Sequence, residues 1–402
     1  MRRALTILLA SVISVGLLSP PAFARALWKT KIDRLAGGKK IGIAVREDGR
    51  YLYRHRSARK RVPASNQKLL LSMALFDRLE PTRTIETSAA TSALPGPVID
   101  GDLWLLGRGD PTLSGGGRLA RELPFEATRL GVLAREIKAA GVMRVRGRVI
   151  GSTGYFARDW YAPGWKPDFP ARYIPLPSAL SFEGNVIRGN HIGDPEIRAA
   201  RSLTKKLEKI GVRVRGAPRA AQAPTQLTSV ASVSSKPLST MIRYLNRRSS
   251  NFFAEMFGKR LGAERYGFPG TIAKGASAIV SWARRRSVDV TAHDSSGLSY
   301  ENRVSPNGLV ELLGLAEDRP WGRVLRKGLP AAGEGTLQDR LKGVRLRAKT
   351  GSLTSISSLS GYVWLRRRET WAEFSILSRG MSKTHASTVE DRIVRILTRY
   401  GR

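Results

Sequence analysis

A serine and a lysine three positions apart, Ser65 and Lys68, are the residues best suited to carry out chemistry. Positions i and i+3 of an α-helix share a face, so the Lys68 amine can lie against the Ser65 hydroxyl. A serine hydroxyl needs a nearby base to act as a nucleophile at neutral pH. A buried lysine has a depressed pKa and can accept that proton. The pair therefore indicates serine catalysis, with helix capping by Ser65 as the alternative.

The S-x-x-K spacing occurs twice more, so the spacing alone is weak evidence. The pair that begins at Ser57 lies in a strongly basic stretch, and the pair that begins at Ser202 lies in a helix expected at the surface. Only Ser65 opens an apolar run, residues 69–76, which is typical of a buried helix. Ser65 is therefore the favoured nucleophile.

A second motif, S-x-N, consists of Ser249 and Asn251 and comes just before another apolar helix. The hydroxyl could relay a proton, and the amide could hold a substrate carbonyl. Helix capping is again the alternative, and residues 305–307 repeat the pattern.

A third motif consists of Lys349, Thr350 and Gly351, followed by Ser352, and it ends a strand-like run at 344–348. A lysine charge beside a threonine hydroxyl is suited to binding a carboxylate. The glycine lets a substrate lie close to the strand. The motif thus predicts a carboxylate receptor, although a basic turn is the simpler interpretation of the tripeptide alone.

The two ends of the chain are expected to build one antiparallel sheet with helices around it. Two β-rich runs, 41–46 and 50–54, read as a hairpin, and a buried helix begins near Ser65. Later segments predict helices at 239–259, 271–285 and 387–399, and strands at 344–348, 358–365 and 371–377.

The pattern of residues in the middle of the chain predicts an inserted domain. Glycine and proline there separate short strand-like runs, including 98–106 and 145–150, and helices are expected near 126–140 and 195–210. We therefore predict an α+β protein with a discontinuous catalytic domain, residues 25–80 and 235–402, and a smaller domain at 81–234.

Composition excludes several classes of site. The 402 residues contain no cysteine, so a disulfide scaffold, a zinc-thiolate site and a cysteine nucleophile are excluded. The four histidines do not have metal-ligand spacing, so a histidine-rich metalloenzyme is not expected.

Residues 1–24 read as a secretory signal, with Arg2 and Arg3, an apolar run at 4–18 and a small-x-small site at 22–24. A membrane anchor is the alternative, but the run is shorter than the roughly 20 residues that span a bilayer. Without residues 1–24 the chain keeps 67 basic and 32 acidic residues, a net charge of +35, against +37 for the full chain. In an exported protein this charge indicates anionic wall polymers or a membrane surface as partners, and no nucleic acid is expected.

The order S-x-x-K, S-x-N, K-T-G is that of penicillin-binding proteins and class A β-lactamases. The chain as a whole resembles the DacB-type D-alanyl-D-alanine carboxypeptidases/endopeptidases, the class C low-molecular-mass penicillin-binding proteins. The stretches that carry the resemblance are 63–69, 101–113, 177–181, 294–299, 302–306, 335–337 and 349–353. The resemblance implies an antiparallel sheet flanked by helices, peptidoglycan stem peptides as substrates and β-lactam antibiotics as covalent inhibitors. It also implies a periplasmic or wall-associated enzyme.

The resemblance also implies residue roles. Ser65 would form an acyl-enzyme with the D-Ala-D-Ala carbonyl, Lys68 would be its base, and Ser249 would relay the proton to the leaving amine. The implied substrate-binding residues are Asn251, for the peptide amide, and Lys349, Thr350, Gly351 and Ser352, around the terminal carboxylate. The N–H groups of Ser65 and Ser352 would form the oxyanion hole. The resemblance implies that neither a metal nor an organic cofactor is needed.

Two departures from the family pattern stand out. Most of a third domain that usually follows the stretch ending at Asn185 is absent, and Ser152 stands near the position where a carboxylate is usual. Two other functions therefore remain open: a catalytically weak or silent basic wall-binding protein, and a β-lactamase or esterase of the same fold.

Overall fold

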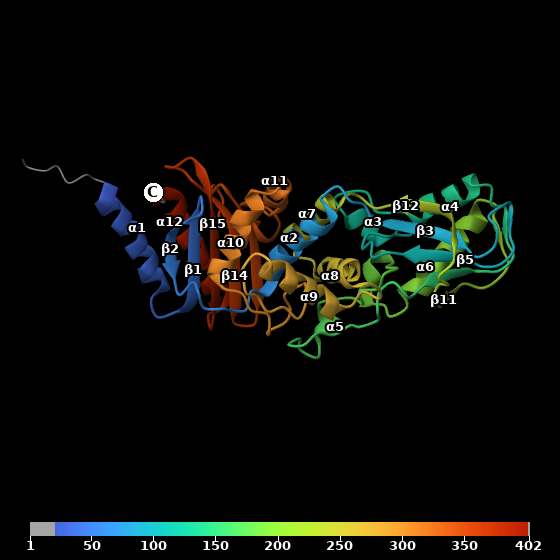
Figure 1. Cartoon of the computed structure of the whole chain (residues 1–402), viewed down its shortest axis with the longest axis horizontal. Coiled ribbons are helices and arrows are strands. Elements are labelled where there is room, and N and C mark those ends of the chain that lie inside the picture. The colour runs from blue at the N-terminus through green and yellow to red at the C-terminus, as the bar shows by residue number, and fades with distance from the viewer. Residues whose placement is uncertain (1–20, 401–402) are drawn as a thin grey trace, which may run out of the picture.

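The computed structural model describes residues 21–400, with side chains from Leu27 to Arg399. The chain is elongated, with a five-stranded sheet toward each end and a group of helices between them (Figure 1). Residues 1–20 of the expected signal peptide lie outside the described residues, and residues 21–24 open helix α1 (Pro21–Ala36). None of the helices within 21–400 has both the length and the apolarity needed to cross a bilayer.

The first sheet joins the two ends of the chain, as predicted. Its strand order is β13-β14-β15-β1-β2, and all of its pairs are antiparallel. The strands are β1 (Lys40–Glu47), β2 (Arg50–His55), β13 (Leu346–Leu353), β14 (Ile356–Leu365) and β15 (Thr370–Arg379). Helices α1 and α12 (Lys383–Tyr400) cover one face, where Trp28, Ile32 and Ile393 pack with strand residues. The structure confirms the α+β class.

A cluster of helices covers the other face and carries two of the three motifs. It consists of η1 (Ala64–Asn66), α2 (Gln67–Leu79), α7 (Leu238–Arg248), α8 (Asn251–Tyr266), α9 (Ile272–Arg284), α10 (Pro306–Glu317) and α11 (Gly322–Gly328). A short turn, η3 (Gly335–Leu337), precedes β13. The prediction of one helix over 239–259 was wrong, because Ser249 has left-handed backbone (φ 55°) and ends α7. Ser250 then starts α8 by accepting a hydrogen bond from the Phe253 amide.

The region at the other end of the molecule has its own apolar core. A five-stranded sheet has the order β11-β7-β5-β3-β12, a three-stranded sheet has the order β10-β6-β4, and β8 pairs with β9. Helices α4 (Leu130–Ala139) and α6 (Pro195–Lys209) lie close to their predicted ranges and pack in this core. The other elements are β3 (Glu86–Thr91), β4 (Val98–Ile99), β5 (Leu103–Gly107), α3 (Arg118–Glu122), β6 (Arg144–Val145), β7 (Val149–Ser152), α5 (Phe169–Arg172), η2 (Glu183–Asn185), β8 (Val186–Ile187), β9 (Asn190–His191), β10 (Arg213–Val214), β11 (Arg219–Ala221) and β12 (Thr228–Ser234).

Two predicted strands in this region were wrong as single elements. Residues 98–106 contain β4 and β5, and residues 145–150 contain parts of β6 and β7, in two different sheets. The half-buried Gly147 lies at the second break, where an added Cβ would lie 2.2 Å from Asp102 Oδ1. Asp102 Oδ1 also accepts the Arg148 amide, so a polar turn separates the two strands.

The chain enters and leaves this region along two adjacent segments. The Leu238 amide donates to Arg83 O over 2.8 Å, and the Ser239 amide donates to Pro81 O over 2.9 Å. A second connection is made by residues 155–180, which lie back against the helices. Phe156 belongs to the apolar core of the helix cluster, and Trp165 packs with Ile272 of α9. Residues of the middle region thus help to build the surroundings of the motifs.

Candidate active site

Ser65 lies on the η1 turn immediately before α2. Two side-chain hydrogen bonds tie this turn to β14: Asn66 Nδ2 donates to Ser360 Oγ over 2.7 Å, and Ser358 Oγ donates to Pro63 O over 2.7 Å. The caps of η1 and α2 make no side-chain hydrogen bond, so capping does not explain Ser65. Its hydroxyl is partly exposed and accepts a hydrogen bond from Lys68.

Lys68 is fully buried in the first turn of α2 and faces three acceptors. Its Nζ lies 3.0 Å from Ser65 Oγ, 2.8 Å from Asn251 Oδ1 and 2.5 Å from Ser296 O. Burial lowers the pKa of Lys68 to about 7, although the nearby carboxylates Asp294 and Glu255 act to raise it. A neutral amine can keep two N–H bonds, to Asn251 and Ser296, and turn its lone pair toward the Ser65 hydroxyl.

Ser249 and Asn251 are brought to the same place by the break between α7 and α8. Ser249 Oγ accepts from Lys349 Nζ over 2.8 Å. Asn251 Nδ2 donates to Tyr173 O over 3.2 Å, while its Oδ1 accepts from Lys68. The side-chain cap of α8 is the intervening Ser250, so neither motif side chain caps this helix, although Ser249 ends α7 as its backbone C-cap.

Lys349, Thr350, Gly351 and Ser352 lie inside β13, not after it as the sequence suggested. Lys349 is fully buried, and burial together with the nearby Lys68 and Lys383 holds its pKa well below the usual range. Its Nζ also donates to Thr350 O over 2.8 Å. Thr350 Oγ1 donates to Thr336 Oγ1 of the η3 turn over 2.7 Å, and Ser352 is exposed.

Gly351 is required by the protein's own packing. A Cβ at this position would lie 2.8 Å from the Ser65 amide nitrogen, 2.9 Å from Pro63 O and 2.2 Å from Ser358 Oγ. The nucleophile turn therefore rests directly on β13, which places the Ser65 amide beside this strand. The sequence argument gave the glycine a role toward substrate, and the structure adds this internal one.

The motif reasoning missed three residues that support the site: Asp294, Trp165 and Glu255. Asp294 is fully buried and accepts through Oδ1 from the Gly297 amide and Asn302, and through Oδ2 from the Ser299 amide and Trp165. These bonds shape the 294–299 loop, which presents Ser296 O to Lys68. Trp165, from the middle region of the chain, thereby helps to fix the active-site loop.

Glu255 supports the same loop from α8. Its Oε1 accepts from the amides of Ser295 and Ser296 over 2.9 and 2.7 Å, and its Oε2 is buried without a hydrogen-bond partner. Burial, followed by the nearby Asp294 carboxylate, raises the pKa of Glu255 to about 8. The signal that could have revealed it is a carboxylate four residues after Asn251, on the same face and within the apolar first half of the helix.

The other matches to the S-x-x-K and S-x-N patterns have either a structural role or no role that the structure shows. Lys60 forms an ion pair with Asp289, Ser202 lies on α6, and Ser305 caps α10 by accepting from the Gly308 amide. Ser152 is buried in β7. Within residues 21–400, no group of three or more His, Asp or Glu side chains is arranged to hold a metal ion.

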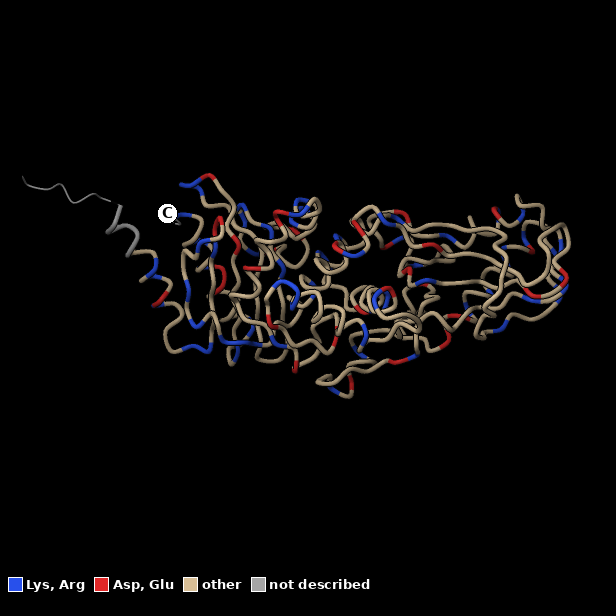
Figure 2. Tube along the Cα trace, viewed as in Figure 1, with Lys and Arg blue, Asp and Glu red and all other residues tan. Residues whose placement is uncertain are grey.

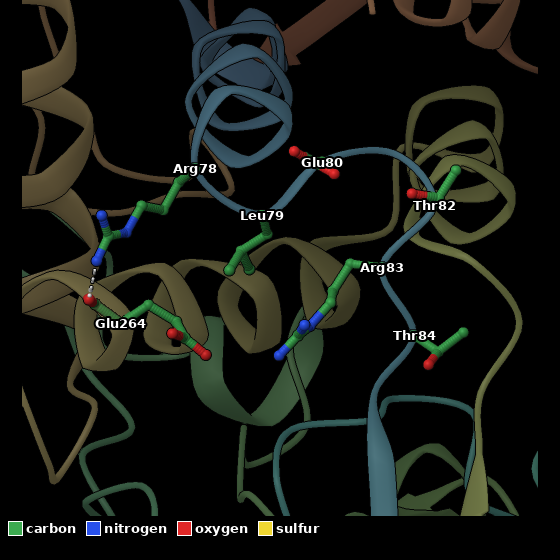
Figure 3. Close-up of a pocket in the computed structure, with 7 residues that line it drawn as sticks. All are labelled: Arg78, Leu79, Glu80, Thr82, Arg83, Thr84 and Glu264. Carbon is green, nitrogen blue, oxygen red and sulfur yellow. Dashed lines mark hydrogen bonds between the residues drawn. The ribbon is translucent and has the colours of Figure 1, made fainter.

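A pocket at the C-terminal end of α2 is too far from Ser65 to belong to this site (Figure 3). It is lined by Arg78, Glu80, Arg83 and Glu264, among others, and Arg78 donates to Glu264 O over 2.8 Å. Because α2 has 13 residues and rises by about 1.5 Å per residue, its two ends are about 20 Å apart. The pocket lies where the chain leaves the helix cluster for the middle region.

Comparison with known proteins agrees with this arrangement. The profile of the D-Ala-D-Ala carboxypeptidase 3 (S13) family matches residues 28–191 and 189–400. A D-alanyl-D-alanine carboxypeptidase of Actinomadura sp. (strain R39) is 27% identical over 92% of this chain and 83% of its own. A carboxypeptidase of Mycobacterium tuberculosis is 31% identical over 75% of this chain and 67% of its own.

The fold is shared with solved structures. Penicillin-binding protein 4 (DacB) of Haemophilus influenzae superposes with a TM-score of 0.78 at 19% identity, over 92% of this chain and 99% of that one. The sheet and helix arrangement predicted from the resemblance is therefore confirmed. This chain belongs to the D-Ala-D-Ala carboxypeptidase 3 (S13) family and is a serine-type D-Ala-D-Ala peptidase.

Proposed function

We propose that Ser65 is the nucleophile, and that it attacks the carbonyl between the two terminal D-alanines of a peptidoglycan stem peptide. The observation that carries this proposal is the 3.0 Å contact between Ser65 Oγ and a buried lysine whose pKa is lowered to about 7. The attack forms an ester between Ser65 and the penultimate residue and releases the terminal amine. Water then hydrolyses the ester and restores the free hydroxyl.

Lys68 is the base in this scheme. Near neutral pH a large fraction of its amine is uncharged, which is the form that can take the Ser65 proton. The acceptors Asn251 Oδ1 and Ser296 O hold its two N–H groups, so the lone pair is directed at the hydroxyl. The 294–299 loop and Glu255 act as positioning groups for this amine.

Lys349 and Ser249 form the second half of the site. Lys349 Nζ donates to Ser249 Oγ, which could pass a proton to the leaving amine. Burial makes the charged form of Lys349 costly, and a substrate carboxylate beside it would restore that charge. This coupling favours peptides that end in a free carboxylate, with Thr350 and Ser352 as further hydroxyl groups along β13. Asn251, whose Nδ2 reaches Tyr173 O, is assigned to the peptide amide.

The two hydrogen-bonded segments at which the chain enters and leaves the middle region support a division of the chain into two domains. Residues 25–80 and 235–402 would form the catalytic domain, and residues 81–234 the inserted one. The paired segments at Arg83 and Leu238 are where the chain crosses between them.

We further propose that residues 1–24 direct export, so that the enzyme acts in the periplasm or at the cell wall. β-Lactams, which mimic the acyl donor, would then acylate Ser65.

Product analysis with defined peptides tests this function. The native protein should release D-Ala from a pentapeptide stem, cleave a cross-linked dimer, or do both, and Ser65→Ala should do neither. Lys68→Ala should be equally inactive, and a cooperative thermal unfolding transition should show that this variant is folded. Release of D-Ala by a folded Ser65→Ala variant would show that another residue is the nucleophile.

A further inference from the structure

A second hollow, of about 410 Å³, lies at the edge of the first sheet, next to the segment that leads to the nucleophile turn. Its walls come from the start of β1, from residues 56–62, and from the facing ends of β14 and β15. Residues 56–62 continue directly into Pro63 and Ser65. We call this hollow the cationic pocket. Figure 2 shows Lys and Arg along the lower edge of the lobe that contains this sheet.

The lining of the cationic pocket is almost entirely basic. Seven of its ten residues are Lys or Arg and none is Asp or Glu, whereas the whole chain has 69 basic and 32 acidic residues. The general positive charge of the chain therefore does not account for this lining. The seven cations are Lys40, Arg56, Arg59, Lys60, Arg61, Arg303 and Arg379.

Most of these cations have no countercharge within the described residues 21–400. Among the seven, only Lys60 has an ion-pair partner in that part of the chain, namely Asp289. Arg61 donates to Ile41 O over 3.0 Å and to Lys40 O over 3.4 Å, and Arg56 donates to Lys39 O over 3.2 Å, so their partners are neutral carbonyls. The guanidinium groups thus repel one another without compensation.

Arg61 sits at the centre of this repulsion. Its Nε is buried and has no hydrogen-bond partner. Burial lowers the pKa of Arg61, and the charges of Arg59, Arg56 and Arg379 lower it further. Arg61 is also held in place by backbone, since its amide and carbonyl both bond to Val304. A bound anion would reduce the repulsion within this fixed, crowded set of cations.

We propose that the cationic pocket binds a phosphate-bearing anion and so holds a polyanionic polymer of the cell envelope beside the active site. Guanidinium groups pair with phosphate through two parallel hydrogen bonds, and several can share one multiply charged group. A single carboxylate would neutralise only one of the cations. The anion chemistry follows from the pocket alone, and the identification of the polymer rests on the proposed function at the wall.

The binding test uses tripolyphosphate and calorimetry on the full chain. The pocket variant is R56Q/R59Q/R379Q, which removes three exposed cations of the lining. The control variant is R121Q/R323Q/R367Q, which removes three exposed arginines that are spread over the surface. We expect the pocket variant to bind at least about tenfold more weakly than native, and the control to stay within about threefold. Equal weakening in both variants, or no binding by the native protein at low salt, would overturn the proposal.

A second arm distinguishes the sources of phosphate. Retention on an immobilised poly(glycerol phosphate) should fall in the pocket variant and not in the control. Selective loss of binding to phosphatidylglycerol vesicles, with polymer retention unchanged, would contradict the polymer and leave a lipid headgroup as the ligand. Acylation by a fluorescent penicillin should be equal in all three proteins, and it reports that each is folded. If the native protein is not acylated, the proposed catalytic function is refuted, whereas the result of the phosphate-binding test still stands.

Discussion

The contact between the Ser65 turn and Gly351 makes the site sensitive to a single methyl group. In Gly351→Ala the new Cβ would lie 2.8 Å from the Ser65 amide nitrogen and 2.9 Å from Pro63 O, whereas ordinary contact begins at 3.4 Å. The turn must therefore move away from β13 by about 0.5 to 0.6 Å. Ser358 Oγ, 2.2 Å from the new atom, can rotate away, but it then loses its 2.7 Å bond to Pro63 O.

This displacement should cost more in catalysis than in folding. A misplacement of about 1 Å costs about 100-fold in rate, so about 0.6 Å should slow acylation by about 10- to 100-fold, or about 1.4 to 2.7 kcal/mol. Overpacking should also lower the free energy of unfolding by about 1 to 3 kcal/mol. The assays are the second-order rate constant for acylation by a fluorescent penicillin, and denaturant unfolding.

Two further variants separate the effects. Gly96→Ala adds a Cβ with no atom within 4 Å and should change neither quantity. The double variant G351A/S358A removes the closest contact but leaves the one with the Ser65 amide, so it should recover some stability while acylation stays slow. A folded Gly351→Ala protein that acylates at the native rate would refute the packing argument.

Other predictions concern the buried charges. Because burial lowers the pKa of Lys68 to about 7, the neutral base accumulates as pH rises, and the acylation rate should rise with a midpoint near pH 7; a flat profile between about pH 5 and 9 would contradict this. Glu255→Gln should keep the rate at pH 7 within about threefold, because a neutral amide can also accept the two loop N–H groups. Glu255→Ala should lose at least about tenfold and shift the pH midpoint, since the loop then has unpaired buried donors. Lys349→Gln should raise KM by about 10- to 100-fold for a peptide with a free terminal carboxylate, and far less for its amidated analogue, which steady-state kinetics would show.

Short-range patterns predicted a large part of this molecule. The hairpin at Lys40–His55 consists of two β-rich runs around a Glu-Asp-Gly turn, and α2 begins where an apolar run follows Ser65. The three motifs could be ranked because each sits at the boundary of a recognisable element. The sheet that joins the two ends could be predicted because β-rich runs occur near both ends of the chain.

The parts that could not be predicted depend on tertiary contacts. The left-handed backbone at Ser249 divides a segment that the sequence predicts to be one helix. This break brings the Ser249 hydroxyl to Lys349, which is distant in sequence. Helices α10 and α11 were not predicted. Asp294 and Glu255 look like ordinary acidic residues until the fold buries them around one loop.

The site residues themselves depend on geometry. The Ser65–Lys68 pair follows from local helix spacing, but the contacts of Lys68 with Asn251 and Ser296 join segments more than 180 residues apart. No local pattern contains those distances. The role of Gly351 likewise appears only when β13 is placed against the nucleophile turn.

The most direct test of the account is to locate the covalent adduct. After incubation with penicillin, intact-mass measurement should show one acyl group per chain, and peptide mapping should place it on Ser65. Ser65→Ala should remain unmodified at the same antibiotic concentration. An adduct on any other residue, or an unmodified native protein that is folded, would contradict the assignment of Ser65 as the nucleophile.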